Sequence, residues 1–184
     1  MEEIINQTVA ALRAGKTILY PTDTLWGIGC DARNNRAVER LYAIKQRDHT
    51  KSMLVLWKKE DGLWMTDADG ERPTTYILPR ERWQTLLQME LAEGLSAADG
   101  SLGIRIPRHD FCQEVIRRLG APLVSTSANL SGHPSPTCYE EIEEELKQRV
   151  DYCVPPLPAF LSAQTQGSRI IKISPEGEET IIRP

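Results

Sequence analysis

The chain has 184 residues, of which 40% are hydrophobic and 26% charged, a composition typical of a globular protein that buries its own core. Its formal net charge is −4 at pH 7, with acidic and basic residues interspersed. This argues against a general nucleic-acid-binding protein, because that function depends on a basic surface. No run of about 18 apolar residues predicts a membrane-spanning helix, and the acidic start "MEEIINQ" lacks the layout of a signal peptide.

Helical and extended patterns alternate along the first half of the chain. Residues 2–14 carry apolar side chains at helical spacing, and Gly15 follows where a C-terminal cap belongs. A second helix is predicted from a cap at Asn34 or Asn35 to about Arg47. The other predicted elements of this half are short strands at 17–20, 52–57 and 74–78, a loop at 58–72 and a helix at 81–91.

The second half continues the alternation. Segments 101–106 and 122–127 are predicted strands, and between them Asp110 caps a helix that ends at Leu119 and is closed by Gly120.

The last third of the chain carries two further signals. Thr137 and Glu140 form a T-x-x-E capping box for a helix that runs to about Arg149. Segments 168–173 and 179–183 are predicted to pair as a hairpin. Together these elements predict an α/β fold, a single domain over residues 1–184, with a mixed sheet.

Neither the cysteines nor the histidines suggest a metal site. The four cysteines lack CxxC spacing, which favours reduced thiols in a cytoplasmic protein. The three histidines lie far apart in the sequence, so no zinc cluster is expected.

The segment "YPTDTLWGIGCDA" (20–32) places small polar residues at the end of a buried strand. Ligands commonly bind at such a sheet edge in α/β folds, and Gly27 and Gly29 permit close backbone approach. Alternatively, the segment is a turn before a second strand, with Asp23 closing an Asx-turn.

The segment "IKQRDHTKS" (44–52) collects three cations. Lys45 lies in the core-facing row of its helix, and Arg47 and Lys51 follow before a buried strand. Such a group suits a polyphosphate. The alternative is a lysine that extends to solvent at a helix C-terminus, beside a solvated face.

The segment "SLGIRIP" (101–107) puts an arginine in an apolar strand. Alternation places Ser101, Gly103 and Arg105 on one face. A buried arginine needs a partner, which is either a protein carboxylate or an anionic ligand.

The segment "LVSTSANLSGHPSPT" (123–137) runs from an apolar strand through many small donors to Thr137. Hydroxyls and free backbone N–H groups at a helix start form a natural anion site. A polar loop leading into a capped helix accounts for the same pattern.

Together these segments resemble the YrdC-like family of threonylcarbamoyl-AMP synthases. The resemblance covers nearly the whole chain and rests on "PTDTLWGIGCDA", the K-x-R pair Lys45 and Arg47 before "KSMLVL", "SLGIRIP" and "STSANLSGHPSPT", with "GSRIIKI" and "IIRP" at the end. It implies a twisted, mixed and largely antiparallel sheet with flanking helices around a deep cavity.

The implied activity is the ATP-dependent condensation of L-threonine with bicarbonate or CO₂ to threonylcarbamoyl-AMP and pyrophosphate, for N6-threonylcarbamoyladenosine in tRNA. Mg²⁺ is expected to accompany ATP, held by phosphates and water, with no protein metal site. Expected partners are a downstream threonylcarbamoyl transferase and, weakly, tRNA.

The resemblance also implies roles for individual residues. Lys45 and Arg47 match the catalytic pair. The threonine-binding residues it implies are Thr24, Arg105, Ser127 and Ser168. The ATP-binding residues it implies are Arg47, Lys51, Ser101, Asn129, Thr137 and Arg183. No general base is assigned.

The chain departs from the family pattern at several places. Ser52 replaces a proline, Trp26 a tyrosine, and Arg169 a small residue, and segment 58–73 is short and keeps only "RPTT" of the usual Pro-Gly-Pro turn. Two alternatives therefore stay open: a paralogue of this fold with other carbamoyl or adenylyl chemistry, and a non-catalytic nucleotide- or RNA-binding module.

Overall fold

The computed structural model describes residues 1–46, 53–60, 63, 65, 72–160 and 166–184. Arg47 and Lys51, two of the predicted site residues, lie outside these ranges. No helix in the described ranges is long and apolar enough to cross a membrane.

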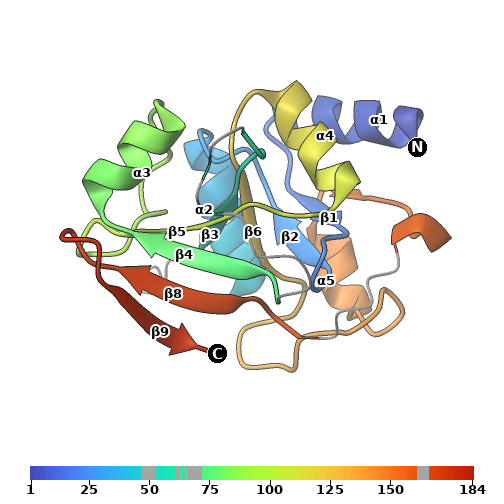
Figure 1. The fold of residues 1–184 in the computed structure, drawn as a ribbon. Coiled ribbons are helices and arrows are strands. Elements are labelled where there is room, and N and C mark those ends of the chain that lie inside the picture. Colours follow the sequence, from blue (N-terminus) through green and yellow to red (C-terminus); the bar gives the residue numbers. More distant parts are fainter. Residues whose placement is uncertain (47–52, 61–62, 64, 66–71, 161–165) are drawn as a thin grey trace.

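Helices and strands alternate along the described chain (Figure 1). The helices are α1 (Glu2–Arg13), α2 (Asn35–Lys45), α3 (Arg80–Leu87), α4 (Asp110–Leu119), α5 (Glu144–Arg149) and a short 3₁₀ turn, η1 (Pro158–Phe160). The strands are β1 (Ile18–Tyr20), β2 (Gly27–Gly29), β3 (Leu54–Leu56), β4 (Thr74–Leu78), β5 (Leu102–Arg105), β6 (Leu123–Ser127), β7 (Tyr152–Cys153), β8 (Arg169–Ile173) and β9 (Glu179–Arg183).

The strands described here form one sheet in the order β7-β1-β2-β6-β3-β5-β4-β8-β9. Five of its pairings are antiparallel and three are parallel, β1 with β7, β3 with β5, and β4 with β8. The predicted mixed, largely antiparallel sheet is confirmed, and so is the hairpin of β8 and β9.

Helices cover the sheet and bury its central strands. Every residue of β1 and β2 is buried, so these strands need cover on both faces. Helices α1 and α4 lie side by side in Figure 1, and α4 buries Phe111, Val115 and Ile116 along one stripe. Arg118 of α4 joins the two helices through its ion pair to Glu2 of α1, and it also pairs with Glu114 within α4.

Most helix ends follow the local signals in the sequence. The Asn34 side chain caps α2 by accepting a hydrogen bond from the Ala37 amide at 3.0 Å. Gly15 takes a φ of +73° after α1, a left-handed conformation that glycine adopts without steric cost.

Two predicted helix boundaries, at α4 and α3, are wrong. Asp110 is the first helical residue of α4 and not its cap, because the preceding His109 occupies the cap position without a side-chain bond. Helix α3 ends at Leu87 and not near 91, since Gln88 adopts a left-handed conformation.

The capping box at Thr137 is also wrong. Helix α5 begins only at Glu144, and the Thr137 amide and hydroxyl both donate to the Glu141 carboxylate. Tertiary contacts override the local signal, because Tyr139 packs edge-on against Trp26 at 4.9 Å between ring centroids and holds this stretch as turns.

Gly29 is required by the close approach of β2 and β6. A Cβ added there would lie 1.9 Å from the Val124 carbonyl oxygen, whereas a Cβ on Gly27 would meet its nearest neighbours at 3.3 Å. We expect Gly29→Ala to lower the free energy of unfolding by about 3 kcal/mol or more, because backbone must move. Gly27→Ala is expected to cost about 1 kcal/mol. Urea denaturation of both variants checks this, and equal losses would contradict it.

Candidate active site

A cavity of about 840 Å³ opens along the middle of the sheet, within the size range of small-molecule sites. Residues of β2, β4, β5, β6 and β8 line it, together with the segment after β1. Its polar lining residues are Thr22, Thr24, Thr75, Asp99, Ser101, Arg105, Ser125, Thr126, Ser127, Ser135, Ser168, Lys172 and Arg183. Side chains far apart in the sequence therefore meet around one space.

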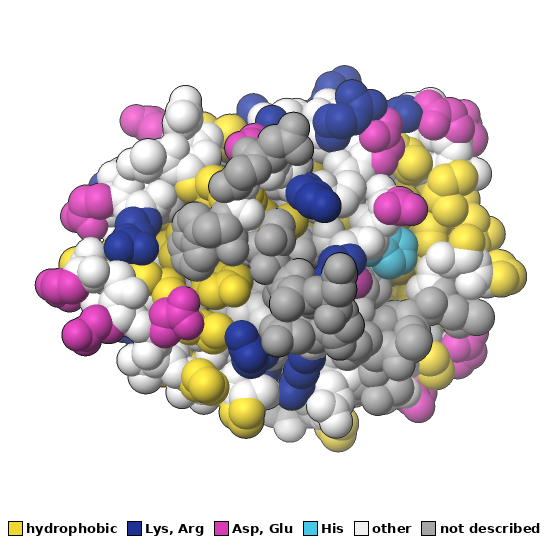
Figure 2. Space-filling model, viewed as in Figure 1, with side chains coloured by type: hydrophobic (Ala, Val, Ile, Leu, Met, Phe, Trp, Pro, Cys, Tyr) yellow, Lys and Arg dark blue, Asp and Glu magenta, His cyan; other side chains and the backbone are white. Residues whose placement is uncertain are grey.

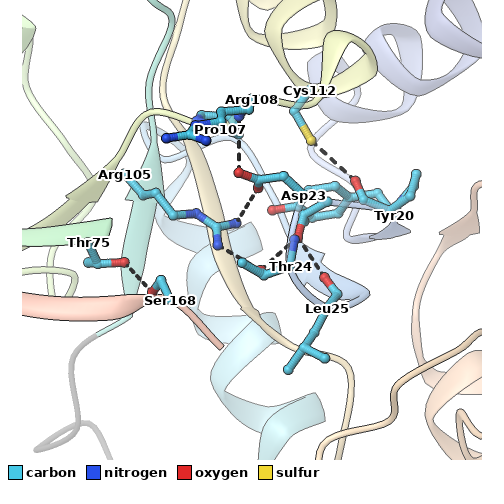
Figure 3. Close-up of polar contacts among 12 residues, drawn as sticks. Tyr20, Asp23, Thr24, Leu25, Thr75, Arg105, Pro107, Arg108, Cys112 and Ser168 are labelled. Carbon is cyan, nitrogen blue, oxygen red and sulfur yellow. Dashed lines mark hydrogen bonds and ion pairs between the residues drawn. The ribbon is translucent and has the colours of Figure 1, made fainter. Parts of the chain in front are cut away.

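Arg105 lies at the centre of the cavity wall. The predicted alternation along β5 is confirmed, because Ser101, Gly103 and Arg105 all line the cavity. Arg105 is only 3% exposed. Its Nη1 donates to the Thr24 hydroxyl at 2.7 Å, and its Nη2 lies 3.3 Å from Asp23 Oδ1 (Figure 3). The Arg105 guanidinium thus pairs with the Asp23 carboxylate and also lines the cavity.

The segment after β1 is a turn shaped by Thr22. The Thr22 hydroxyl donates to the Leu25 carbonyl and accepts from the Thr24 amide. Asp23 does not close this turn as the alternative interpretation expected. Its Oδ2 instead accepts a hydrogen bond from the Arg108 amide at 3.1 Å, and Figure 3 shows its carboxylate between Arg105 and Arg108.

Ser168 and Arg183 bring the end of the chain to the same cavity. The Ser168 and Thr75 hydroxyl oxygens are 2.7 Å apart. Arg183 Nε and Nη2 both donate to the Ser168 carbonyl, at 2.8 and 2.5 Å. Burial, and then the positive charges of Arg72 and Arg105, lower the pKa of the Arg183 guanidinium. The cavity therefore holds closely spaced cations at this end.

Lys45 lies behind the cavity wall and outside the lining. It is 3% exposed, and its ammonium group donates to the carbonyls of Ser127 and Asn129 at 2.5 and 2.6 Å and lies 2.9 Å from Asn129 Oδ1. The side chain does not extend to solvent. Its charge instead holds the end of β6 against α2.

Asn129 belongs to this anchored loop. Its Nδ2 donates to the His133 carbonyl at 2.6 Å, and its Oδ1 accepts from the Ser127 hydroxyl at 2.5 Å. Ser127 faces the cavity, so Lys45 and Asn129 fix the position of a lining residue.

Asp99 and Lys172 form a second polar group that sequence reasoning missed. The Ser101 hydroxyl donates to Asp99 Oδ1 at 2.6 Å, and Lys172 Nζ donates to Asp99 Oδ2 at 2.9 Å. These contacts hold the pKa of the Asp99 carboxyl below its usual range. Ser168, Ile170 and Lys172 alternate in the sequence and all line the cavity. This alternation is the signal from which Lys172 could have been predicted as a lining residue.

The structure brings together most of the predicted site residues whose positions it describes. Those that line the cavity are Thr24, Ser101, Arg105, Ser127, Ser168 and Arg183. Lys45 and Asn129 lie directly behind Ser127. Thr137 is exposed, bonds Glu141 and is not among the lining residues.

The described part of the chain contains no group of three or more His, Cys, Asp or Glu side chains that could hold a metal ion. Among the described lining residues, Asp99 is the one that carries a carboxylate. Its two oxygens accept hydrogen bonds from Ser101 and Lys172.

Comparisons with known proteins agree on one family. The family model Sua5_yciO_yrdC, described as "Telomere recombination", matches residues 10–184. A threonylcarbamoyl-AMP synthase of Vibrio campbellii is 30% identical over 176 residues, with 88% of each chain covered.

Two solved structures share the fold. E. coli YciO matches with a TM-score of 0.73 and 22% identity over 100% of this chain and 89% of its own. P. abyssi Sua5 complexed with L-threonine matches with a TM-score of 0.71 and 21% identity over 92% of this chain. The present chain spans about half the length of that Sua5 chain (50%).

The buried ammonium of Lys45 makes a testable contribution to stability. We expect Lys45→Met to lower the free energy of unfolding by about 3 kcal/mol, because it leaves buried carbonyl oxygens without a donor. The matched variant Lys16→Met removes an exposed lysine and should change stability by less than about 0.5 kcal/mol. Urea denaturation measures both; a Lys45→Met protein as stable as Lys16→Met would refute the anchoring role.

Proposed function

The chain belongs to the Sua5/YciO/YrdC family, and from that premise we propose that it is an L-threonylcarbamoyladenylate synthase. It condenses L-threonine, bicarbonate or CO₂, and ATP to threonylcarbamoyl-AMP and pyrophosphate, for N6-threonylcarbamoyladenosine formation in tRNA. Support comes from the curated relatives that carry the name threonylcarbamoyl-AMP synthase, which the chain matches over most of their length. E. coli YciO has the same fold, and a fold alone does not determine a reaction, so the proposal rests on the site.

The observation that carries the proposal is the buried Arg105 in the cavity wall beside Thr24. A guanidinium can bind a carboxylate through two parallel hydrogen bonds. Hydroxyl groups of Thr24, Ser127 and Ser168 line the same space, and they suit the amine, hydroxyl and carboxylate of threonine. A cavity for a nucleotide alone would not need this set.

The nucleotide is placed toward the other polar residues of the cavity. Arg183 supplies positive charge for the phosphates, and Ser101 and the loop at Asn129 lie on the nucleotide side. We keep Arg47, Lys51 and Thr137 as proposed ATP contacts on the sequence pattern alone, since two lie outside the described residues and Thr137 bonds Glu141.

The chemistry needs few protein groups. The threonine nitrogen forms a bond to the carbon of CO₂ and loses a proton to water, which gives a carbamate. A carbamate oxygen then attacks the α-phosphorus of ATP, and pyrophosphate leaves with the electron pair of the broken P–O bond. The residues contribute by holding both substrates in line and by balancing negative charge.

Mg²⁺ is proposed to enter with ATP. The proposal includes no metal held by protein ligands alone, because Asp99 is the one carboxylate among the described lining residues. Phosphates and water are the usual ligands of Mg²⁺ at such sites.

We further propose that a separate transferase uses the product on tRNA. A weak direct contact between this chain and tRNA is part of the same proposal, and the net charge of −4 limits it to a local surface.

Omission experiments test the activity. We expect the purified protein to release pyrophosphate from ATP only when L-threonine and bicarbonate are both present, with L-serine a poorer substrate. Leaving out one component at a time, followed by detection of the adenylate by mass spectrometry, measures this. Nucleotide binding without threonine-dependent release would favour the paralogue with other chemistry or the binding module.

Arg105→Lys tests the threonine side of the site. We expect kcat/KM for L-threonine to fall about 100-fold, because a lysine keeps the charge beside Asp23 but loses the bidentate guanidinium. The KM for ATP should change less than threefold. The matched control, Arg36→Lys, alters an exposed residue of α2. An Arg105→Lys enzyme with unchanged threonine kinetics would overturn the assignment.

A further inference from the structure

Asp99 fixes the direction of the Ser101 hydroxyl at one end of the cavity. The Ser101 hydroxyl oxygen lies 2.6 Å from Asp99 Oδ1, and the Ser101 amide donates to the same oxygen at 3.0 Å. Lys172 Nζ donates to Asp99 Oδ2 at 2.9 Å. The hydrogen bonds from Ser101 and Lys172 lower the pKa of the Asp99 carboxyl, so at neutral pH it is a carboxylate that can only accept. The single hydroxyl hydrogen of Ser101 is therefore donated to Asp99.

The hydroxyl oxygen of Ser101 keeps its lone pairs for the cavity. Ser101 is only 6% exposed, and it lines the cavity. Within the described part of the chain, no N–H or O–H group donates to this oxygen. A buried oxygen of this kind is usually satisfied by a hydrogen-bond donor, from a ligand or from water. Toward a ligand, Ser101 is thus an acceptor and not a donor.

The turn that carries Asp99 and Ser101 is held in place by backbone bonds. The Ala97 amide donates to the Ser101 carbonyl and the Gly100 amide donates to the Ala97 carbonyl, both at 2.8 Å. The buried Trp83 side chain donates from Nε1 to the Gly100 carbonyl at 2.9 Å. The hydroxyl is therefore oriented before a ligand binds, which lowers the entropy cost of binding.

Ser101 lies far from the cationic end of the cavity. It precedes Arg105 by four residues along β5, and an extended strand rises about 3.3 Å per residue, which separates them by about 13 Å. A threonine held at Arg105 is too short to reach Ser101, whereas a nucleotide can span that distance. Arg183 lies near Arg105, whose positive charge lowers the pKa of Arg183.

The charges on the surface follow the same direction. Figure 2 shows Lys and Arg side chains close together near the C-terminus, and Asp and Glu side chains toward the turn that joins β8 and β9. Ionised phosphate oxygens carry no hydrogen, so they suit the guanidinium groups of Arg105 and Arg183. They do not suit Ser101, which offers only lone pairs and lies beside the Asp99 carboxylate.

We propose that Asp99 is a positioning residue of the nucleotide site: it fixes the Ser101 hydroxyl as an acceptor, and Ser101 thereby selects an N–H or O–H donor of the nucleoside. The donors of this class in ATP are the 6-amino group of adenine and the two ribose hydroxyls. This deepens the proposed function and rests on it in one respect, that ATP is a substrate. Neither the sequence pattern nor the comparisons give Asp99 a role.

Binding of ATP and three analogues tests the contact. ITP has a carbonyl in place of the 6-amino group, 2′-deoxy-ATP lacks one ribose hydroxyl, and 3′-deoxy-ATP lacks the other. We expect calorimetry, with Mg²⁺ and without threonine, to show at least one analogue binding about tenfold more weakly than ATP, because Ser101 then meets no donor. The weak analogue identifies the donor. Binding of all three within about twofold of ATP would overturn the proposal.

Asp99→Ala tests the positioning role. The preference for ATP over the weak analogue should fall from about tenfold to about twofold, because the freed hydroxyl can turn and no longer requires a donor. Asp99→Asn keeps an oxygen that accepts from Ser101 and should retain the preference. The control Glu93→Ala removes an exposed carboxylate of the same loop, outside the lining residues, and should also retain it. The Lys172 and Asp99 side chains are 45% and 54% exposed, so the loss of their ion pair costs little stability.

A merely structural role gives a different pattern. If Asp99 only holds the turn, Asp99→Ala will weaken ATP and all the analogues by one factor, the preference will stay, and the proposal is wrong. It is equally wrong if Asp99→Asn loses the preference as fully as Asp99→Ala, because charge and not hydroxyl direction would then matter. Should Asp99→Ala fail to fold, Ser101→Ala removes the acceptor itself and must abolish the same preference.

The outcome can be separated from that of the proposed function. Nucleotide binding requires no turnover, so a protein that shows the preference but releases no pyrophosphate with threonine keeps this inference and loses the proposed activity. An active synthase that binds ATP and all three analogues alike loses only this inference. A protein that binds no nucleotide refutes both.

Discussion

The burial of one guanidinium shapes the cavity. Arg105 sits on a central strand, opposite Thr75 on β4 and Leu56 on β3, where an unpaired charge would cost several kcal/mol. Asp23 and the Thr24 hydroxyl offset that cost, so the segment after β1 must turn toward β5. The backbone amide of Arg108 then fixes the Asp23 carboxylate from the other side. The first role of Asp23 and Thr24 is therefore to stabilise the buried charge of Arg105.

Two buried cations, Lys45 and Arg105, make different contacts at the cavity wall. Lys45 directs its ammonium group at oxygens of Ser127 and Asn129 and so holds a lining residue in place; its catalytic role stays a prediction. Arg105 lines the cavity, and its planar fork can engage a ligand beside Thr24. A single point charge suits the gathering of several carbonyls, whereas the recognition of a carboxylate favours the fork.

The sequence allowed much of this arrangement to be predicted, because strand alternation and helix spacing are local. The faces of β5 and of α2 followed from periodicity alone, and Asn34 carries its own cap. The choice between an internal carboxylate and a ligand for Arg105 could not be made, since it depends on how a turn 81 residues earlier folds. The helix start predicted at Thr137 was wrong because the packing of Tyr139 on Trp26 outweighs a local capping signal.

A crystal structure of the protein with L-threonine and a non-hydrolysable ATP analogue tests the central claim, that Arg105 is a preorganised carboxylate site within the cavity. The account predicts that the threonine carboxylate lies within hydrogen-bonding distance of the Arg105 guanidinium, with the Asp23 contact retained and the phosphates toward Arg183. Threonine bound elsewhere, or an Arg105 that still contacts only Asp23 and Thr24 in the complex, would contradict it.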